Sequence, residues 1–403
     1  MKVFEINTVC GTGSTGRIAV DLAKMLEEHG DLCCIAFSRG SAPKDVDTYL
    51  FGNKAEIYWH GIMTRITDRH GMYSKGATRQ LIEKIKEYKP DLIHLHNVHG
   101  YYLNIELLFG FLKDYGKPVV WTLHDCWTYT GHCSHYTCVE CNKWQSECYS
   151  CPLKGDYPGS LILDNSTANY RTKKKLFTAV SNMHLVTPSE WLKQEVEKSF
   201  FKDIPCTAIP NGIEIEKFTY TESNLREKLG LQNKKVILGV ANVWTKQKGF
   251  EDFIQLSQIL DESYKLVMIG VDEKRKKLLP SNILALERTK NIEELIEYYS
   301  MSDIYFNSSI EETMGMTTGE AICCGVPVVA YRSTAIPESV GEGCGIVLEP
   351  HDTEGVARAF EQILAEKEKY HAACMAYRSR FDKKIANAAY YKLYQSMLSE
   401  KER

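Results

Sequence analysis

Residues Ile310–Pro327 read I-E-E-T-M-G-M-T-T-G-E-A-I-C-C-G-V-P and decide how the second half of the chain folds. They join two apolar runs, Ile304–Ser309 and Val326–Tyr331, whose length and composition predict buried strands. The residues between the runs predict a short turn and then a helix that begins near Gly315. A strand, a turn, a helix and a second strand in this order are the repeating unit of a parallel α/β sheet.

Two carboxylates eight residues apart, Glu312 and Glu320, flank this turn. The start of a helix offers free backbone N–H groups and a partial positive charge, which favour a bound phosphate. Glu320 falls on the second turn of the helix, and a carboxylate there suits the neighbouring hydroxyls of a ribose. Glu312 suits a second polyhydroxylated group. The arrangement indicates a nucleotide-sugar site, and the competing interpretation is a strand–turn–helix with two solvated glutamates.

The composition describes an ordinary globular protein. A chain of 403 residues is too long for one core and suggests two domains. Lys and Arg number 49 and Asp and Glu 52, a formal charge of −3 that gives no support for a nucleic-acid partner. Apolar runs are too short to cross a bilayer, and Glu5 and Asn7 interrupt the first one, which argues against a signal peptide. We therefore expect a cytoplasmic protein with reduced cysteines.

Apolar strands alternate with helical patterns in both halves, which predicts an α/β fold of two Rossmann-like, doubly wound domains. Ligands bind beyond the carboxyl ends of such strands, so two facing domains would form a cleft with the donor on one side and the acceptor on the other. The polar stretch Phe218–Gln232 is expected to be a linker with a short helix. The expected strands are Val3–Val9, Cys33–Ser38, Leu92–His96, Val119–His124, Leu185–Thr187 and Cys206–Ile209, then Lys235–Asn242, Lys265–Gly270, Ile283–Leu286, Ile304–Asn307, Val328–Ala330 and Ile346–Leu348.

The segment around the two glutamates resembles the E-x7-E motif of retaining glycosyltransferases of family 4, which have the GT-B fold, and the similarity extends over nearly the whole chain. The resemblance implies an N-terminal acceptor domain over residues 1–216, with a cysteine-rich insertion at 126–165. It also implies a C-terminal nucleotide-sugar domain over 217–381 and a last helix, 382–403, that packs back on the first domain. Asn211-Gly212 matches the interdomain turn of the family.

The sequence Gly11-Thr12-Gly13-Ser14-Thr15-Gly16 has the pattern G-x-G-x-x-G and follows the first expected strand. A dinucleotide-dependent oxidoreductase would bind pyrophosphate there, but it also needs an acid at the end of the second strand, which reads Phe37-Ser38-Arg39. The resemblance instead assigns Gly13 and Ser14 to the donor phosphates and the acceptor. A tight turn that only needs glycine is the alternative.

The sequence Lys246-Gln247-Lys248-Gly249 resembles the family segment in which an Arg, and then a Lys before Gly, bind the diphosphate. Lys248 matches that Lys, whereas Asn242 occupies the Arg position, so one charge contact is missing unless Lys246 supplies it. Neutralising the departing diphosphate is the main catalytic demand, and the loss therefore matters. The backbone N–H groups of the turn would complete this site, at Thr313, Met314, Gly315 and Met316.

His124 ends an expected strand of the first half and matches the family histidine that approaches the reacting sugar and the acceptor; a core or capping histidine is the alternative. Asp125 could orient it or contact a hydroxyl. We interpret His94, His96 and His99 as cleft wall, because strand alternation gives them no clear third metal ligand. The sequence Asp45-Val46-Asp47 is the only D-x-D, and we interpret it as a solvated loop and not as a metal site.

Six of the 14 cysteines lie between Cys126 and Cys151, with the spacing C-x6-C-x4-C-x2-C-x6-C-x2-C. The two C-x2-C pairs, Cys138/Cys141 and Cys148/Cys151, are typical of a structural zinc site, although six intervening residues are few. A second ligand set consists of Cys133, Cys141, Cys148 and Cys151. Free thiols and disulfides are the alternatives. The aromatic residues of the segment could stack on sugars or, as we expect, fill a small core.

These observations together predict a retaining glycosyltransferase that moves a sugar from a nucleoside diphosphate to an acceptor hydroxyl without a catalytic metal. The resemblance implies a saccharide or lipid-linked saccharide acceptor in bacterial capsule, exopolysaccharide or lipopolysaccharide synthesis, with peripheral contact at the inner face of the membrane. Lys173-Lys174-Lys175 could serve that contact, and a solvated helix face is the simpler interpretation. An epimerase or hydrolase of nucleotide sugars on the same fold, and a sugar-binding protein without catalysis, are the remaining alternatives.

Overall fold

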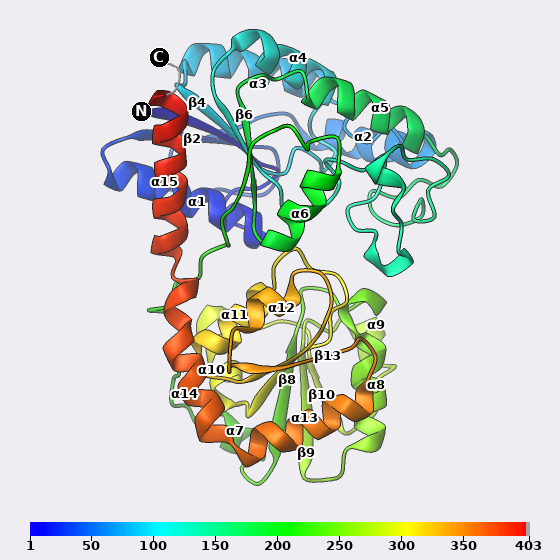
Figure 1. Ribbon diagram of the computed structural model, residues 1–403, viewed down its shortest axis with the longest axis vertical. Coiled ribbons are helices and arrows are strands. Elements are labelled where there is room, and N and C mark those ends of the chain that lie inside the picture. The colour runs from blue at the N-terminus through cyan, green and yellow to red at the C-terminus, as the bar shows by residue number, and fades with distance from the viewer. Residues whose placement is uncertain (400–403) are drawn as a thin grey trace. The chain divides into compact units, whose positions relative to one another are not determined.

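The computed structural model describes residues 1–399 and divides into two compact units (Figure 1). Unit 1 contains Met1–Pro210 and the end of the chain from Ala386 on, and unit 2 contains Asn211–Ile385. The division therefore falls at Pro210, six residues before the boundary that we expected, and the return of the chain falls after Ile385.

Unit 1 is built on a parallel sheet of seven strands in the order β3-β2-β1-β4-β5-β6-β7. Helices cover both faces of the sheet, whose central strands are mostly buried, while the edge strands β3 and β7 are partly exposed. The expected strands are confirmed apart from their ends, whereas β3, α2 and α6 were not expected. The strands are β1 Lys2–Ile6, β2 Leu32–Phe37, β3 Thr48–Leu50, β4 Leu92–Leu95, β5 Val119–Thr122, β6 Met183–Thr187 and β7 Cys206–Ala208, and the helices are α1 Gly13–Glu28, α2 Lys54–Thr67, α3 Lys75–Tyr88, α4 Ile105–Tyr115, α5 Ser166–Phe177, α6 Glu190–Lys198 and α15 Lys383–Ser399.

Helix α15, drawn in red in Figure 1, packs beside α1 on one face of the sheet of unit 1, while α3, α4 and α6 cover the other face. Two tyrosines of α15 reach into the sheet. The hydroxyl of Tyr390 lies 2.9 Å from that of Thr122, and the hydroxyl of Tyr394 lies 2.8 Å from Nδ1 of His94. These contacts make the last helix a part of unit 1.

Unit 2 contains a parallel sheet of six strands in the order β10-β9-β8-β11-β12-β13. Its two cores place α10, α11 and α14 on one face and α8 and α13 on the other. The strands are β8 Lys235–Val240, β9 Tyr264–Ile269, β10 Ile283–Leu286, β11 Ile304–Asn307, β12 Val328–Tyr331 and β13 Gly345–Leu348, the helices are α7 Leu225–Lys228, α8 Phe250–Ile259, α9 Glu273–Lys276, α10 Ile292–Met301, α11 Met316–Cys323, α12 Ile336–Val340, α13 Thr353–Ala365 and α14 Lys367–Tyr377, and η3 Lys246–Lys248 and η4 Arg378–Phe381 are 3-10 turns.

The stretch Phe218–Gln232, expected to be a linker, belongs to the body of unit 2. Phe218 is buried in the core of this unit, and the guanidinium of Arg226 donates to Asp303 across 2.6 Å. The polar composition that suggested a linker arises because α7 lies on the surface and is held by this ion pair.

The cysteine-rich segment between β5 and α5 contains two short 3-10 turns, η1 Thr137–Val139 and η2 Lys143–Gln145, and otherwise consists of loops and turns. The expectation that its aromatic residues fill a small core is confirmed for four of them, since all four side chains are buried, while Tyr149 is 55% exposed. The buried four are Trp127, Tyr129, Tyr136 and Trp144.

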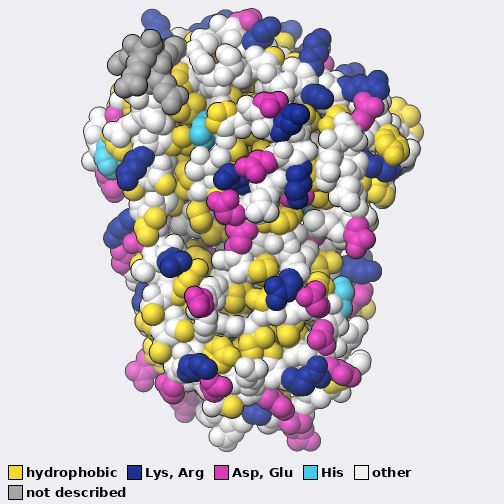
Figure 2. Space-filling view, viewed as in Figure 1, with side chains coloured by type: hydrophobic (Ala, Val, Ile, Leu, Met, Phe, Trp, Pro, Cys, Tyr) yellow, Lys and Arg dark blue, Asp and Glu magenta, His cyan; other side chains and the backbone are white. Residues whose placement is uncertain are grey.

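The surface carries basic and acidic side chains intermixed over the face shown in Figure 2. Within residues 1–399, the helices lack the combination of length and apolar content that a membrane span requires.

Candidate active site

An ion pair between Lys248 and Glu312 forms the centre of the candidate site in unit 2. Nζ of Lys248 donates to Oε1 of Glu312 across 2.8 Å. The lysine ends the turn η3, and Gly249 follows it with a φ of +71°, where a Cβ would lie 2.4 Å from the carbonyl oxygen of Ser308. Glycine therefore lets the loop after β8 pack directly on the end of β11, which brings together two side chains 64 positions apart in the sequence.

Glu312 is held in place from several sides. The hydroxyl of Ser309 donates to its Oε1 at 2.8 Å, and its own backbone N–H donates to the hydroxyl of Thr334 at 3.0 Å. The carboxylate is only 10% exposed, whereas the side chain of Lys248 is 34% exposed. A nearly buried carboxylate with one cation and one hydroxyl donor is a fixed acceptor for hydrogen bonds.

Helix α11 begins at Met316, immediately after this turn, as the sequence predicts. Its N-cap residue is Gly315, which offers no side-chain cap, and its first turn carries no acidic residue, so no carboxylate of the helix offsets the partial positive charge at this end. The N–H of Gly315 is already engaged, because it donates to the hydroxyl of Ser339 at 3.1 Å. Thr313 and Met314 form the half-buried bend that precedes the helix.

Glu320 lies on α11 but is more enclosed than a ligand for ribose hydroxyls would need to be. Glu320 is only 7% exposed, and its Oε2 accepts a hydrogen bond of 3.0 Å from the hydroxyl of Tyr299. Burial, and then the neighbouring Glu320, raise the pKa of Tyr299, so the tyrosine remains a neutral donor. The carboxylate is thus oriented by Tyr299.

Asn242, which stands where the family pattern has an arginine, contacts an arginine from another loop. The guanidinium of Arg288, just after β10, donates to Oδ1 of Asn242 at 3.3 Å, and both residues are exposed. Gly270, after β9, has a φ of +95°, and a Cβ there would lie 1.7 Å from the carbonyl oxygen of Ala241. The loops after β8, β9 and β10 are thus packed backbone to backbone. Our sequence reasoning missed Arg288, because only the sheet order brings its loop to Asn242.

The glycine-rich loop of unit 1 opens α1. The helix begins at Gly13, whose φ is +65°, and Thr12 provides no side-chain cap. Gly13 and Ser14 are exposed, and the loop is closed by a bond of 2.9 Å from the N–H of Gly11 to the carbonyl of Gly16. The first turn carries no acidic residue, so the start of this 16-residue helix presents an open, electropositive surface.

His124 follows β5 and continues a row of buried polar groups. Its Nε2 lies 3.2 Å from Nδ1 of His96, and Oε2 of Glu5 lies 3.3 Å from Nε2 of His96, without the alignment of a hydrogen bond. Burial lowers the pKa of both histidines to about 3 and raises that of Glu5. At neutral pH both histidines are therefore neutral, and His124 can position a hydroxyl group by accepting or donating a hydrogen bond.

Asp125 pairs with His99 of the preceding loop, with Oδ2 and Nε2 2.8 Å apart. Burial would raise the pKa of Asp125, but the adjacent His99 outweighs it and lowers the pKa to about 2. Asp125 therefore carries a negative charge at neutral pH, and its Oδ1 accepts the N–H of Trp127 at 2.9 Å.

The expectation that His94, His96 and His99 form a cleft wall is wrong, because all three are buried. The two nitrogens of His94 lie 2.8 Å from the hydroxyls of Thr122 and Tyr394. Within residues 1–399 only Glu5, His94 and His96 bring three ligand-type atoms within 4.8 Å of one another. Because hydroxyls already engage both nitrogens of His94, we interpret this group as a buried hydrogen-bond network.

Two other sequence features lie away from the strand ends. Asp45 is exposed and pairs with Lys24 at 2.7 Å, as expected of a solvated loop. The run Lys173-Lys174-Lys175 is solvated only at its last two members, because Lys173 is 1% exposed. Burial lowers the pKa of Lys173 to about 7.

The cysteines of the insertion do not all lie together. Cys133, Cys141, Cys148 and Cys151 line one cavity, while Cys138 is exposed and is not among the residues that line it. The arrangement that pairs Cys138 with Cys141 as one zinc-binding pair therefore does not match the structure.

Solved structures that also contain two sheets of this kind show the class of fold. Sucrose-phosphate synthase from Thermosynechococcus elongatus matches with a TM-score of 0.71 at 16% identity, over 99% of each chain. HepE from Anabaena, solved in complex with UDP and glucose, matches with a TM-score of 0.69 at 17% identity, over 98% of this chain and 100% of that one. The two Rossmann-like units therefore have the GT-B fold.

The sequence comparisons give the family. The profile of Glycosyltransferase Family 4 matches residues 15–217, and that of the Glycosyl transferases group 1 matches residues 221–380. The chain therefore belongs to glycosyltransferase family 4. WcaC from Escherichia coli strain K12, assigned provisionally as a colanic acid biosynthesis glycosyl transferase, is 24% identical over 362 residues, 86% of each chain.

Proposed function

We propose that this glycosyltransferase moves a sugar, with retention of its anomeric configuration, from a nucleoside diphosphate sugar to a hydroxyl group of a saccharide or lipid-linked saccharide. The observation that carries the proposal is the Lys248–Glu312 pair of 2.8 Å beside the uncapped start of α11. A cation and a helix start suit a diphosphate, and a fixed carboxylate next to them suits the hydroxyls of the attached sugar.

Two relatives support the chemical class of the substrates. HepE, with the same fold, binds UDP and glucose, and the relation to WcaC favours a growing surface polysaccharide as acceptor.

The charge on the leaving diphosphate is the main demand on this site. Breaking the bond from sugar to phosphate leaves a negative charge, and fixed cations lower the energy of that state more than the energy of the bound donor. In our proposal Lys248 and the start of α11 supply part of the positive charge that offsets it. Arg288 supplies the part that an arginine at position 242 would otherwise give, because its guanidinium lies 3.3 Å from Oδ1 of Asn242.

The remaining groups would orient the sugar and the acceptor. In a front-face reaction, which retains the configuration, the acceptor arrives on the face from which the phosphate departs, and the leaving phosphate oxygen can accept the proton of the acceptor hydroxyl. Glu312 would hold the sugar hydroxyls and Glu320 the ribose. Gly13, Ser14 and the neutral His124 would bind the donor phosphates and the acceptor.

A donor screen followed by product analysis tests the proposal. Thermal shift with UDP, GDP and ADP and with their sugars should identify one nucleotide series that raises Tm. The selected sugar, incubated with membrane lipid extracts or oligosaccharides, should give a glycosylated product, a free nucleoside diphosphate and an unchanged anomeric configuration by NMR. Donor consumption at the same rate without any acceptor would indicate a hydrolase or an epimerase and would refute the transfer.

The assignment of Arg288 has its own test. Arg288→Gln should lower kcat by about 10²-fold, in line with the loss of one stabilising donor in the transition state. Adding Asn242→Arg to this variant should restore activity, because the new guanidinium starts from the position that the family uses. Arg332→Gln, which removes an exposed cation of the same unit, is the control. Equal effects of Arg288→Gln and Arg332→Gln would contradict the assignment.

A further inference from the structure

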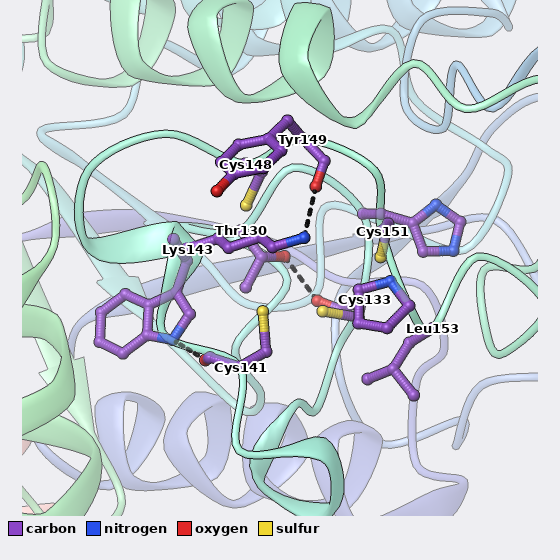
Figure 3. Close-up of a pocket in the computed structure, with 11 residues that line it drawn as sticks. Thr130, Cys133, Cys141, Lys143, Cys148, Tyr149, Cys151 and Leu153 are labelled. Atoms are coloured by element: carbon purple, nitrogen blue, oxygen red, sulfur yellow. Dashed lines mark hydrogen bonds between the residues drawn. The ribbon is translucent and has the colours of Figure 1, made fainter.

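The cysteine-rich segment of unit 1 has four thiols around one small cavity. Figure 3 shows the sulfur atoms of Cys133, Cys141, Cys148 and Cys151 turned toward the same space. The cavity has a volume of about 10 Å³, which is close to the room needed for one water molecule or ion. All four cysteines are free, and their spacing in the sequence is C-x7-C-x6-C-x2-C.

The segment lacks the elements that usually hold a chain of this length in place. Loops of more than about 15 residues without regular structure are uncommon in compact domains unless something else fixes them. Here residues 126–165 contain only the turns η1 and η2, and the small aromatic core described above is their main apolar support. Bound metal ions and disulfides are the two common supports for such segments, and the cysteines are not paired in disulfides.

One backbone N–H near the cavity already donates to sulfur. The N–H of Gly131 lies 3.2 Å from Sγ of Cys148. Hydrogen bonds from N–H to sulfur are stronger when the sulfur carries a negative charge, because the acceptor is then ionised. The loop geometry thus suits thiolates.

A buried cation next to the thiols points in the same direction. Lys173 of α5 is 1% exposed, and its Nζ donates to the carbonyls of Trp127 and Thr130 at 2.7 and 3.1 Å. These partners are neutral, whereas a buried ammonium group is costly unless a negative charge lies nearby. Thr130 also lines the cavity, so this ammonium group lies close to the thiols. An anionic group there would offset part of its charge, in addition to the ring of Trp127, whose centroid lies 3.4 Å from Nζ.

We propose that Cys133, Cys141, Cys148 and Cys151 bind one zinc ion as a tetrahedral tetrathiolate that holds the insertion in shape. Binding replaces four S–H bonds by four Zn–S bonds and releases four protons to the solvent. The resulting centre has a net charge of −2, and Lys173 offsets part of it inside the protein. The role is structural, because four protein ligands leave no open position for substrate.

Neighbouring side chains help to define the ligand set. His132 lines the same cavity, but its Nδ1 is bound to Asp68 and its Nε2 lies 3.4 Å from the carbonyl of Asp156. Cys138 is exposed and lies outside the lining. The four cysteines are thus the remaining ligands at the cavity.

Zinc would draw the four sulfurs closer together. Within residues 1–399 no three cysteine sulfurs lie within 4.8 Å of one another, whereas ligand sulfurs on one tetrahedral zinc lie about 3.8 Å apart because each Zn–S bond is about 2.3 Å long. All four cysteines stand on loops and turns, which can follow such a movement.

Metal analysis with a matched cysteine control tests the proposal. Protein purified from zinc-supplemented cells should contain about one zinc ion per chain by mass spectrometry of the elements, as a structural site of high affinity requires. Cys148→Ser and Cys141→Ser should lose most of this zinc, whereas Cys138→Ser should keep it. Wild-type protein without zinc, or equal loss from Cys138→Ser, would overturn the proposal.

A second measurement does not depend on the folding of the variants. Cobalt(II) added to wild-type protein from which the metal has been removed should give the visible bands and the sulfur charge-transfer band of tetrahedral cobalt thiolate, and excess zinc should remove them. Limited alkylation of the zinc-loaded protein should modify Cys138 and leave the four proposed ligands protected. Octahedral cobalt spectra, or disulfides among these cysteines in non-reducing peptide maps, would refute the site. Neither readout requires activity, so a failure here is separate from a failure of the proposed transfer reaction.

Discussion

Replacing Lys248 by methionine separates its contribution to stability from its contribution to catalysis. Methionine keeps most of the length of the side chain and removes the charge. Because Lys248 is 34% exposed, solvent screens its ion pair with Glu312, and the pair contributes at most about 1 kcal/mol to stability. The carboxylate of Glu312 keeps its hydrogen bond of 2.8 Å from Ser309 in the variant, which limits the cost further.

The expected catalytic effect is larger than the expected effect on stability. A charged donor that faces the leaving diphosphate stabilises the transition state by about 3–4 kcal/mol, which corresponds to a loss of about 10²–10³ in kcat. A loss of about 1 kcal/mol in stability would shift Tm by only about 2–4 °C for a domain the size of unit 2. The variant should therefore fold normally and turn over slowly.

The assay measures release of the nucleoside diphosphate at saturating donor and acceptor, together with Tm and the donor Kd. Lys274→Met, at an exposed position on α9, controls for the loss of one positive charge in the same unit. The reasoning fails if Lys248→Met keeps more than about a fifth of the wild-type kcat, since that is a loss of about 1 kcal/mol or less in transition-state stabilisation. It also fails if Tm falls so far that unfolding explains the lost activity.

Three further predictions concern other parts of the molecule. Glu320→Gln should raise the Kd of the nucleotide about tenfold and change kcat less, because the carboxylate proposed to hold the ribose becomes an amide; unchanged binding by calorimetry would contradict that role. Gly270→Ala should cost at least about 2 kcal/mol, because the new Cβ would lie 1.7 Å from the oxygen of Ala241, whereas Gly230→Ala, at a φ of +67° with open space, should cost about 1 kcal/mol by urea denaturation. His60 accepts the N–H of Gly71 and His70 that of Gly100, and burial lowers the pKa of His60 to about 3 and that of His70 well below its usual value. Both pKa values lie below those of the unfolded chain, so the unfolded state takes up protons first and the free energy of unfolding falls as the pH drops below about 6.5. By pH 5.5 each histidine should lower the free energy of unfolding by about 1.4 kcal/mol. A Tm that stays constant between pH 7.5 and 5.5 would disprove this.

The strands and the central motif of unit 2 could be predicted because the information is local. The runs before and after the two glutamates are mostly apolar and are bounded by turn residues, and they became β11 and β12 as expected. Gly315 marked the start of α11 because glycine is common in turns, although its φ of −79° is one that other residues also adopt.

Helix α2 was not predicted because several of its apolar side chains are exposed and several of its polar side chains are buried. Tyr58 and Trp59 are 74% and 59% exposed, while the polar His60 and Thr64 on the same helix are buried. His60 is stabilised inside by its bonds to Ser74 and to the N–H of Gly71, which lie well beyond a helical window. The spacing of apolar residues in the helix does not indicate such distant partners. A helix that buries polar residues and exposes apolar ones therefore cannot be recognised from its own residues.

The three lysines of α5 show that the burial of a charged residue is equally hard to predict from its neighbours in the sequence. Three consecutive lysines suggest a solvated or membrane-facing surface, and two of them are exposed. Consecutive positions on a helix point in different directions, about 100° apart, so one of three neighbours must face inward when the helix packs on a sheet. Lys173 is that residue, and only the tertiary structure reveals that it lies against the cysteine-rich loop.

The contact between Asn242 and Arg288 indicates why a missing arginine need not disable the site. What the leaving diphosphate requires is positive charge at a point in space, and any loop that reaches the carboxyl end of β8 can supply it. Parallel sheets bring the ends of several strands to one edge, and here the glycine after β9 lets the neighbouring loops approach within van der Waals distance. If Arg288 serves this function, the double variant Arg288→Gln with Asn242→Arg moves the guanidinium from one loop to another and keeps the charge in the same place. Its activity then measures whether the position of the charge in space is enough for the reaction.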